Sequence, residues 1–152
     1  MLEQIKKANF PILNGNLFFE GTDDLVWDNP YLILERAGIK IGIIGLHGKF
    51  AFYDTINFKM TEGIEARDEE EYLRQYIKEL EPITDIIILA VHQGMPGRQS
   101  TIGLTDVERN LYKDILLAQN VPGVDIIVTG HAHQGTETVS YTHLRAHETG
   151  YN

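Results

Sequence analysis

Two short apolar runs, each leading to a histidine, constrain this chain more than any other feature. Residues 85–91 (DIIILAV) run directly into His92, and residues 125–129 (DIIVT) run into Gly130 and His131. Short runs rich in β-branched residues and bounded by turn residues indicate buried strands. Open α/β sheets place their chemistry at the carboxyl ends of strands. We therefore expect an α/β fold with these histidines at one edge of its sheet.

A further histidine, His133, follows His131 with one residue between them. In an extended loop, side chains at i and i+2 can point to different neighbours, so this pair suits two adjacent metal ions. Imidazole nitrogen is a common ligand for zinc, iron and manganese. We predict that His92, His131 and His133 share a metal site. The alternative is that they cap strand ends, in a non-catalytic α/β module that binds a partner.

These segments resemble the calcineurin-type metallophosphoesterases, specifically their 5'-nucleotidase branch. The strand-His-x-Gly segment of that family is matched by residues 92–94, and its Gly-His-x-His segment by residues 130–133. Residues 8–16 and 38–46 resemble two of its core strands. The resemblance covers residues 1–138 and implies part of the αββα sandwich of the metallophosphoesterase domain.

The resemblance also implies a chemistry. It predicts a phosphoric ester hydrolase with two divalent ions (Zn, Mn or Fe), in which His92 and His131 hold one ion and His133 holds the other. The expected substrates are nucleotides that lose phosphate, with cyclic nucleotides or another phosphoester as the alternative. The family further suggests a periplasmic, secreted or cell-surface location.

Three family motifs are absent from this sequence. It has no Asp-x-His, no Gly-Asp and no Gly-Asn-His-Glu. We therefore expect a fragment that lacks the opening metal motifs and the carboxyl-terminal nucleotide-binding domain, and that is inactive alone. We assign no catalytic residue and no substrate-binding residue within it. His47 to Phe50 also depart from the family, which usually has threonines and a Pro-rich turn there.

The end of the chain has a different character. Residues 139–149 (VSYTHLRAHET) resemble the translation of a sequencing-library adapter. We therefore divide the chain into a partial metallophosphoesterase domain at 1–138 and a non-native tail at 139–152, which we expect to pack on nothing. For this reason His143 and His147, spaced i and i+4, are not interpreted as a helical metal site.

Charge and composition limit the possible partners. The chain of 152 residues has 13 Lys and Arg against 22 Asp and Glu, a net charge of −9. This acidity disfavours binding to nucleic acid, which requires clustered basic residues. A phosphoester substrate would depend on local metal charge. We expect no membrane segment, and the absence of cysteine excludes thiolate ligands and disulfides.

Two helices are expected between the strands. Residues 64–81 form the first, with one apolar face made of Tyr72, Leu73, Tyr76, Ile77 and Leu80. Residues 105–119 form the second, capped by Thr105 and Glu108. Its expected sheet-facing residues are Val107, Leu111, Ile115 and Leu116. His47 and Arg98 are interpreted as polar loop residues, with contacts to substrate as the alternative.

Overall fold

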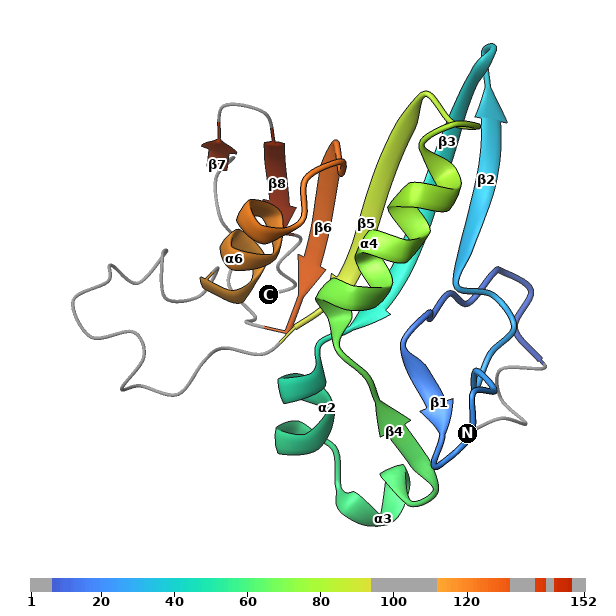
Figure 1. Cartoon of the computed structure of the whole chain (residues 1–152), viewed down its shortest axis with the longest axis vertical. Coiled ribbons are helices and arrows are strands. Elements are labelled where there is room, and N and C mark those ends of the chain that lie inside the picture. The colour runs from blue at the N-terminus through green and yellow to red at the C-terminus, as the bar shows by residue number, and fades with distance from the viewer. Residues whose placement is uncertain (1–6, 94–111, 132–138, 142–143, 149–152) are drawn as a thin grey trace.

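A six-stranded sheet forms the centre of the molecule (Figure 1). The computed structural model describes residues 7–93, 112–131, 139–141 and 144–148. In spatial order, the strands are β2 (Tyr31–Arg36), β3 (Ile39–His47), β5 (Ile86–His92), β6 (Ile126–Gly130), β8 (Leu144–Glu148) and β7 (Val139–Tyr141). Strands β3, β5, β6 and β8 run parallel, and β2 and β7 pair antiparallel at the two edges. The expected α/β fold class is confirmed.

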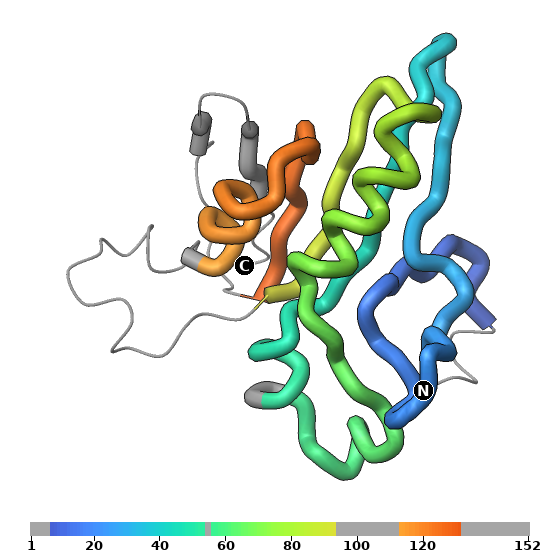
Figure 2. Tube along the Cα trace, viewed as in Figure 1, coloured from blue at the N-terminus to red at the C-terminus, as the bar shows by residue number. Residues whose placement is uncertain are grey.

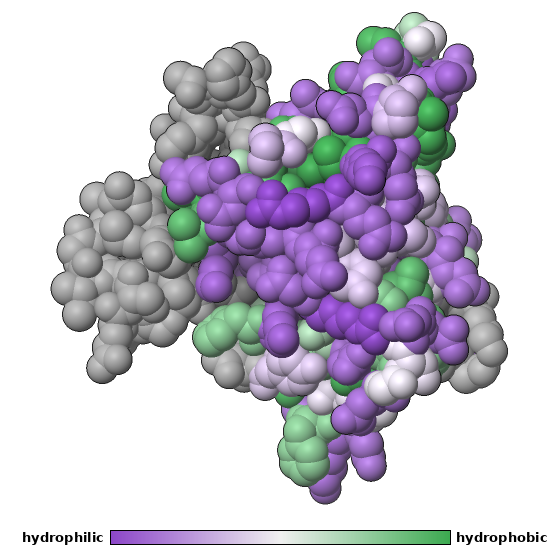
Figure 3. All heavy atoms as spheres, in the orientation of Figure 1, coloured by the Kyte–Doolittle hydropathy of each residue, from purple (hydrophilic) through white to green (hydrophobic). Residues whose placement is uncertain are grey.

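Two helices cover one face of this sheet (Figure 1). They are α4 (Glu69–Leu80) and α6 (Tyr112–Asn120). Their buried side chains meet those of β3, β5 and β6 in one core, whose least exposed members are Ile44, Leu73, Leu80, Leu89, Leu117 and Val121. The surface above α4 is mostly hydrophilic (Figure 3). This division matches the amphipathic pattern of residues 69–80.

The first helix begins later than the sequence predicted. Ile64–Ala66 forms a strand, β4, that pairs antiparallel with β1 (Leu17–Phe19). Figure 2 shows these two distant segments side by side. The helix begins at Glu69 because the Asp68 side chain accepts hydrogen bonds from the backbone N–H groups of Glu70 and Glu71. The apolar face predicted for it is confirmed at Leu73, Tyr76, Ile77 and Leu80, which are buried, while Tyr72 is half-buried.

Two short helices follow β3. They are α2 (Lys49–Thr55) and α3 (Phe58–Thr61), and they lead into β4. A second small core lies here, formed by Leu17, Val26, Phe52 and Ala66. Beside it, the guanidinium of Arg67 lies 4.0 Å from the ring centre of Phe18 and forms ion pairs with Asp23 and Glu65. These contacts fasten the amino-terminal segment to β4.

The second predicted helix is observed as α6, and residues 105–111 lie outside the described ranges. Its most buried residue is Leu117, at 2% exposure, whereas Ile115 and Leu116 are only half-buried. The buried side of α6 is therefore rotated about the helix axis, towards Leu117, relative to the side that the sequence predicted.

The tail does not behave as expected. The backbone of β8 pairs in parallel with β6, with Ile126 opposite Arg145. The expectation that residues 139–152 pack on nothing is wrong for these backbone groups, whereas their non-native origin stays a prediction. Within the described ranges, no helix has the length and apolar character needed to cross a bilayer.

Candidate metal centre

Two of the three predicted histidines lie in contact. His92 is the last residue of β5, and His131 follows β6 directly. The His131 Nδ1 and His92 Nε2 atoms are 3.0 Å apart, and the two rings are nearly perpendicular. His133 lies outside the described residues. The structure thus brings His92 and His131 together from neighbouring parallel strands, at one edge of the sheet.

The backbone around His131 makes this contact possible. His131 has a φ of 104°, a conformation that residues other than glycine rarely adopt. At Gly130, an added Cβ would lie only 3.3 Å from the His92 Nδ1 atom. A larger residue there would press on the His92 ring. A strained turn and a small residue therefore allow the two imidazoles to meet.

A third histidine, which the sequence interpretation treated as a polar loop residue, lies beside this pair. His47 ends β3 and stands opposite His92 in the β3–β5 register, with the ring centroids 5.3 Å apart. Burial lowers the pKa of His47 and so favours the neutral form of its ring. Its Nδ1–H donates to the Gly48 carbonyl at 3.1 Å, which leaves Nε2 as an acceptor. One signal could have identified it: like His92, it ends a core strand.

The backbone of His47 is held by a fully buried asparagine. The Asn16 Nδ2 atom donates to the carbonyls of His47 (2.7 Å) and Arg67 (2.9 Å), and its Oδ1 atom accepts from the His47 N–H (2.9 Å). Asn16 has no exposed surface. Its three bonds connect the end of β3 to the segment that follows β4.

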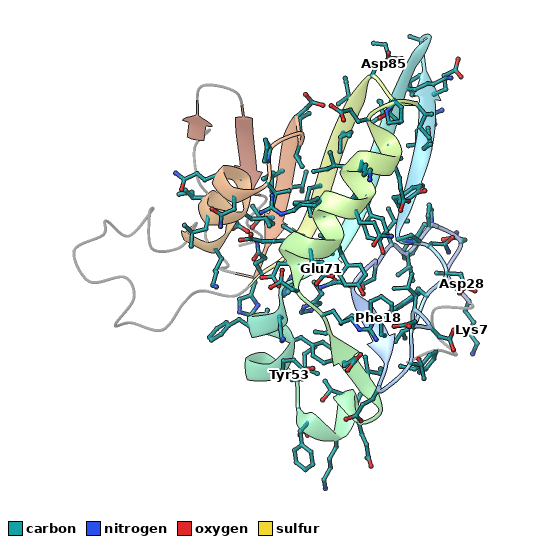
Figure 4. All side chains as sticks on the ribbon, viewed as in Figure 1. Lys7, Phe18, Asp28, Tyr53, Glu71 and Asp85 are labelled. Atoms are coloured by element: carbon teal, nitrogen blue, oxygen red, sulfur yellow. The ribbon has the colours of Figure 1, made fainter. Side chains whose placement is uncertain are left out.

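A pocket of about 400 Å³ lies where α2 begins, two residues after His47. Its lining residues are Lys49, Phe50, Tyr53, Asp68, Glu69 and Lys113. Figure 4 shows Tyr53 on α2, at the opposite end of the molecule from Asp85. Two lysines and two carboxylates cancel in charge, so the pocket by itself gives no preference for an anionic ligand. Arg98, the other predicted candidate for a substrate contact, lies outside the described ranges.

The chemistry of the paired histidines fits a divalent ion. Two nitrogens bound to one tetrahedral ion at roughly 2.0–2.1 Å lie about 3.3–3.4 Å apart, so the His92–His131 separation of 3.0 Å would need to widen only slightly to hold an ion. Among the residues that the structure describes, no group of three or more His, Cys, Asp or Glu is arranged to hold an ion. The described part of the site therefore offers a pair of nitrogen donors that needs further ligands.

Comparison with known sequences identifies a single protein family. The model of the calcineurin-like phosphoesterases matches residues 5–135. Protein UshA of Yersinia enterocolitica is 30% identical over 95% of this chain, and a 5'-nucleotidase of Vibrio cholerae is 32% identical over 88%. A 2',3'-cyclic-nucleotide 2'-phosphodiesterase/3'-nucleotidase of Haemophilus influenzae is 26% identical over 88%. The matched regions make up 26%, 24% and 20% of these relatives, so the chain spans about a quarter of their length.

Solved structures share the fold. A putative 5'-nucleotidase from Staphylococcus aureus aligns over 97% of this chain and 28% of its own, with a TM-score of 0.74 and 22% identity. The sulfate thiohydrolase SoxB of Thermus thermophilus aligns over 97% of this chain and 24% of its own, with a TM-score of 0.76 and 17% identity. With the family model matching most of its length, the chain belongs to the calcineurin-like phosphoesterase family.

Proposed function

We propose that this chain is part of a metal-dependent phosphoesterase that acts on nucleotides, with His92, His131 and His133 as metal ligands. The observation that carries the proposal is the 3.0 Å approach of the His92 and His131 ring nitrogens at the carboxyl edge of the sheet. The family match and the 5'-nucleotidase among the relatives support the type of reaction.

Each histidine has a distinct part in this proposal. His92 and His131 bind one ion, and His133 binds a second. Divalent ions bound there would polarise the phosphoryl oxygen and lower the pKa of a water molecule. His47 adds a neutral imidazole beside His92. The Nε2 atom of His47 can accept a hydrogen bond.

The substrate class is proposed as 5'-nucleotides. Hydrolysis of 2',3'-cyclic nucleotides is the second candidate, favoured by the relative from Haemophilus influenzae that carries that name. Assays of AMP and of 2',3'-cyclic AMP under identical metal conditions separate the two. A location outside the cytoplasm stays a prediction from the family resemblance.

The decisive experiment measures phosphate release from AMP with zinc or manganese. It compares this chain with a longer protein that contains it and supplies the absent family motifs. The longer protein should turn over AMP and lose activity with a chelator, while this chain alone should be inactive because its sequence has no Asp-x-His, Gly-Asp or Gly-Asn-His-Glu motif.

Alanine at His92, His131 or His133 should lower activity by more than the roughly 10–100-fold typical of residues that only support a metal ligand. Alanine at Asn57, an exposed residue with a local hydrogen bond to the Lys59 N–H, is the control and should leave activity unchanged. Robust turnover by this chain alone, or a longer protein indifferent to loss of His133, would contradict the proposal. Absence of all hydrolysis would favour the non-catalytic binding module.

A further inference from the structure

A buried carboxylate is hydrogen-bonded to residues that lie next to the two contacting histidines in the sequence. Asp114, on the first turn of α6, is 7% exposed. Its Oδ1 atom accepts a hydrogen bond from the Gln93 Nε2 atom at 3.0 Å, and its Oδ2 atom accepts one from the Thr129 hydroxyl at 2.8 Å. Gln93 and Thr129 are each 5% exposed. These are buried hydrogen bonds to a carboxylate, which are stronger than bonds between neutral groups when it is ionised.

The two partners of Asp114 are neighbours of the two histidines in sequence. Gln93 directly follows His92, and Thr129 precedes His131 by two residues. One carboxylate therefore holds the ends of both β5 and β6. A shift of either strand end would break a buried hydrogen bond and leave a polar atom without its partner, which is costly.

We infer that Asp114 is a positioning residue for the histidine pair: by holding Gln93 and Thr129, it sets the distance between His92 and His131. The metal-binding consequence rests on the proposed function above. The spacing of the two rings, in contrast, is a property of the metal-free chain and is measurable without any ion.

A second carboxylate provides a matched control at the other end of the same strands. The Asp125 Oδ2 atom accepts from the Ile87 N–H at 2.8 Å, and so connects the amino ends of β5 and β6. Figure 4 places Asp85, at the start of β5, at this far end of the sheet. Asp125→Asn makes the same chemical change as Asp114→Asn on the same strand pair, but away from the histidines.

The first measurement is NMR of ¹⁵N-labelled histidine in the metal-free chain. In the wild type, the signals of His131 Nδ1 and His92 Nε2 should show their mutual hydrogen bond. Asp114→Asn and Thr129→Val should abolish it, whereas Asp125→Asn should retain it. Thr129→Ser keeps the hydroxyl and should recover what Thr129→Val loses.

The second measurement is zinc affinity by titration calorimetry, with the melting temperature recorded for each variant. Asp114→Asn and Thr129→Val should weaken zinc binding by about 10–100-fold, the range typical for residues that orient metal ligands. If Asp114→Asn fails to fold, the Val and Ser variants of Thr129 still decide the question.

Two results separate this inference from the proposed function. Variants that lower the melting temperature but leave the histidine signals and zinc affinity as in Asp125→Asn would overturn the inference and show that Asp114 only fastens α6. The other result is that the wild-type chain binds no zinc while the Asp114→Asn variant loses the contact between His92 and His131. This result would support the inference and contradict the proposed metal site.

Discussion

At the scale of single residues, the edge of the sheet that carries His47, His92 and His131 combines a strained backbone at His131 with buried hydrogen bonds from Asn16 to His47. His131 has a positive φ, and backbone conformations of this kind cost roughly 1–3 kcal/mol and cluster at functional sites. Asn16, in contrast, is a buried side chain whose amide groups are all hydrogen-bonded and hold the backbone of His47 in place. The histidines are thus held by their surroundings.

The strain at His131 predicts that glycine is better tolerated than alanine. Both His131→Gly and His131→Ala remove the imidazole, but glycine adopts a positive φ without a Cβ clash. We expect the glycine variant to be more stable to urea by about 1 kcal/mol. Equal stability, or a more stable alanine variant, would show that the backbone at His131 is unstrained.

Asn16 should be among the polar residues whose replacement lowers the unfolding free energy most. Asn16→Ala leaves the carbonyl of His47, its N–H and the carbonyl of Arg67 without their partner. Since each unsatisfied buried group costs about 1–3 kcal/mol, we expect a loss of about 3 kcal/mol in unfolding free energy, measured by urea denaturation. Asn57→Ala is the control, because Asn57 is exposed and makes one local bond to the Lys59 N–H. Similar losses in both variants would contradict the role of Asn16.

At the scale of elements, the spacing of apolar residues predicted the buried face of a helix better than the residue at which the helix begins. The apolar spacing of residues 69–80 identified the buried face of α4 correctly. Ile64–Ala66 was included in the helix because its strand conformation depends on pairing with β1, far away in sequence. His47 was underestimated for the same reason: its register opposite His92 is set by pairing that the sequence does not display.

The start of α4 gives a prediction at this scale. Asp68 accepts hydrogen bonds from two backbone N–H groups of the first turn. Asp68→Ala should cost about 1 kcal/mol of unfolding free energy, whereas Asp68→Ser, which can still cap, should lose little. The two variants are compared by thermal and urea unfolding. An alanine variant as stable as the serine variant would show that the cap is unimportant.

At the scale of the whole molecule, the two faces of the sheet are unequal. The face under α4 and α6 carries Ile44, Leu89 and Ile127, all nearly inaccessible. The other face carries Ile43 and Ile88, half-buried, and Val128, at 39% exposure. No helix of the described ranges packs there in Figure 1. Strands that are apolar on both faces are typical of sheets covered on both sides, as a two-sheet sandwich requires.

The proposed non-native origin of residues 139–152 leads to the last prediction. The buried residues of β6, Ile127 and Thr129, are covered from the helix face, whereas β8 adds backbone pairing at the strand edge. Such pairing replaces hydrogen bonds to water for little net gain, and ordering the tail costs entropy. Deleting 139–152 should therefore change the unfolding free energy by less than about 1 kcal/mol.

A proline scan makes this test specific to the strand. Ala146→Pro disrupts the β6–β8 pairing and should leave the melting temperature unchanged if the tail is not native. Ala90→Pro in β5 is the matched control and should destabilise the protein by about 3 kcal/mol, because β5 lies between β3 and β6 whether or not the tail pairs. A large fall in melting temperature with Ala146→Pro or with the deletion would mean that residues 139–152 belong to the native fold.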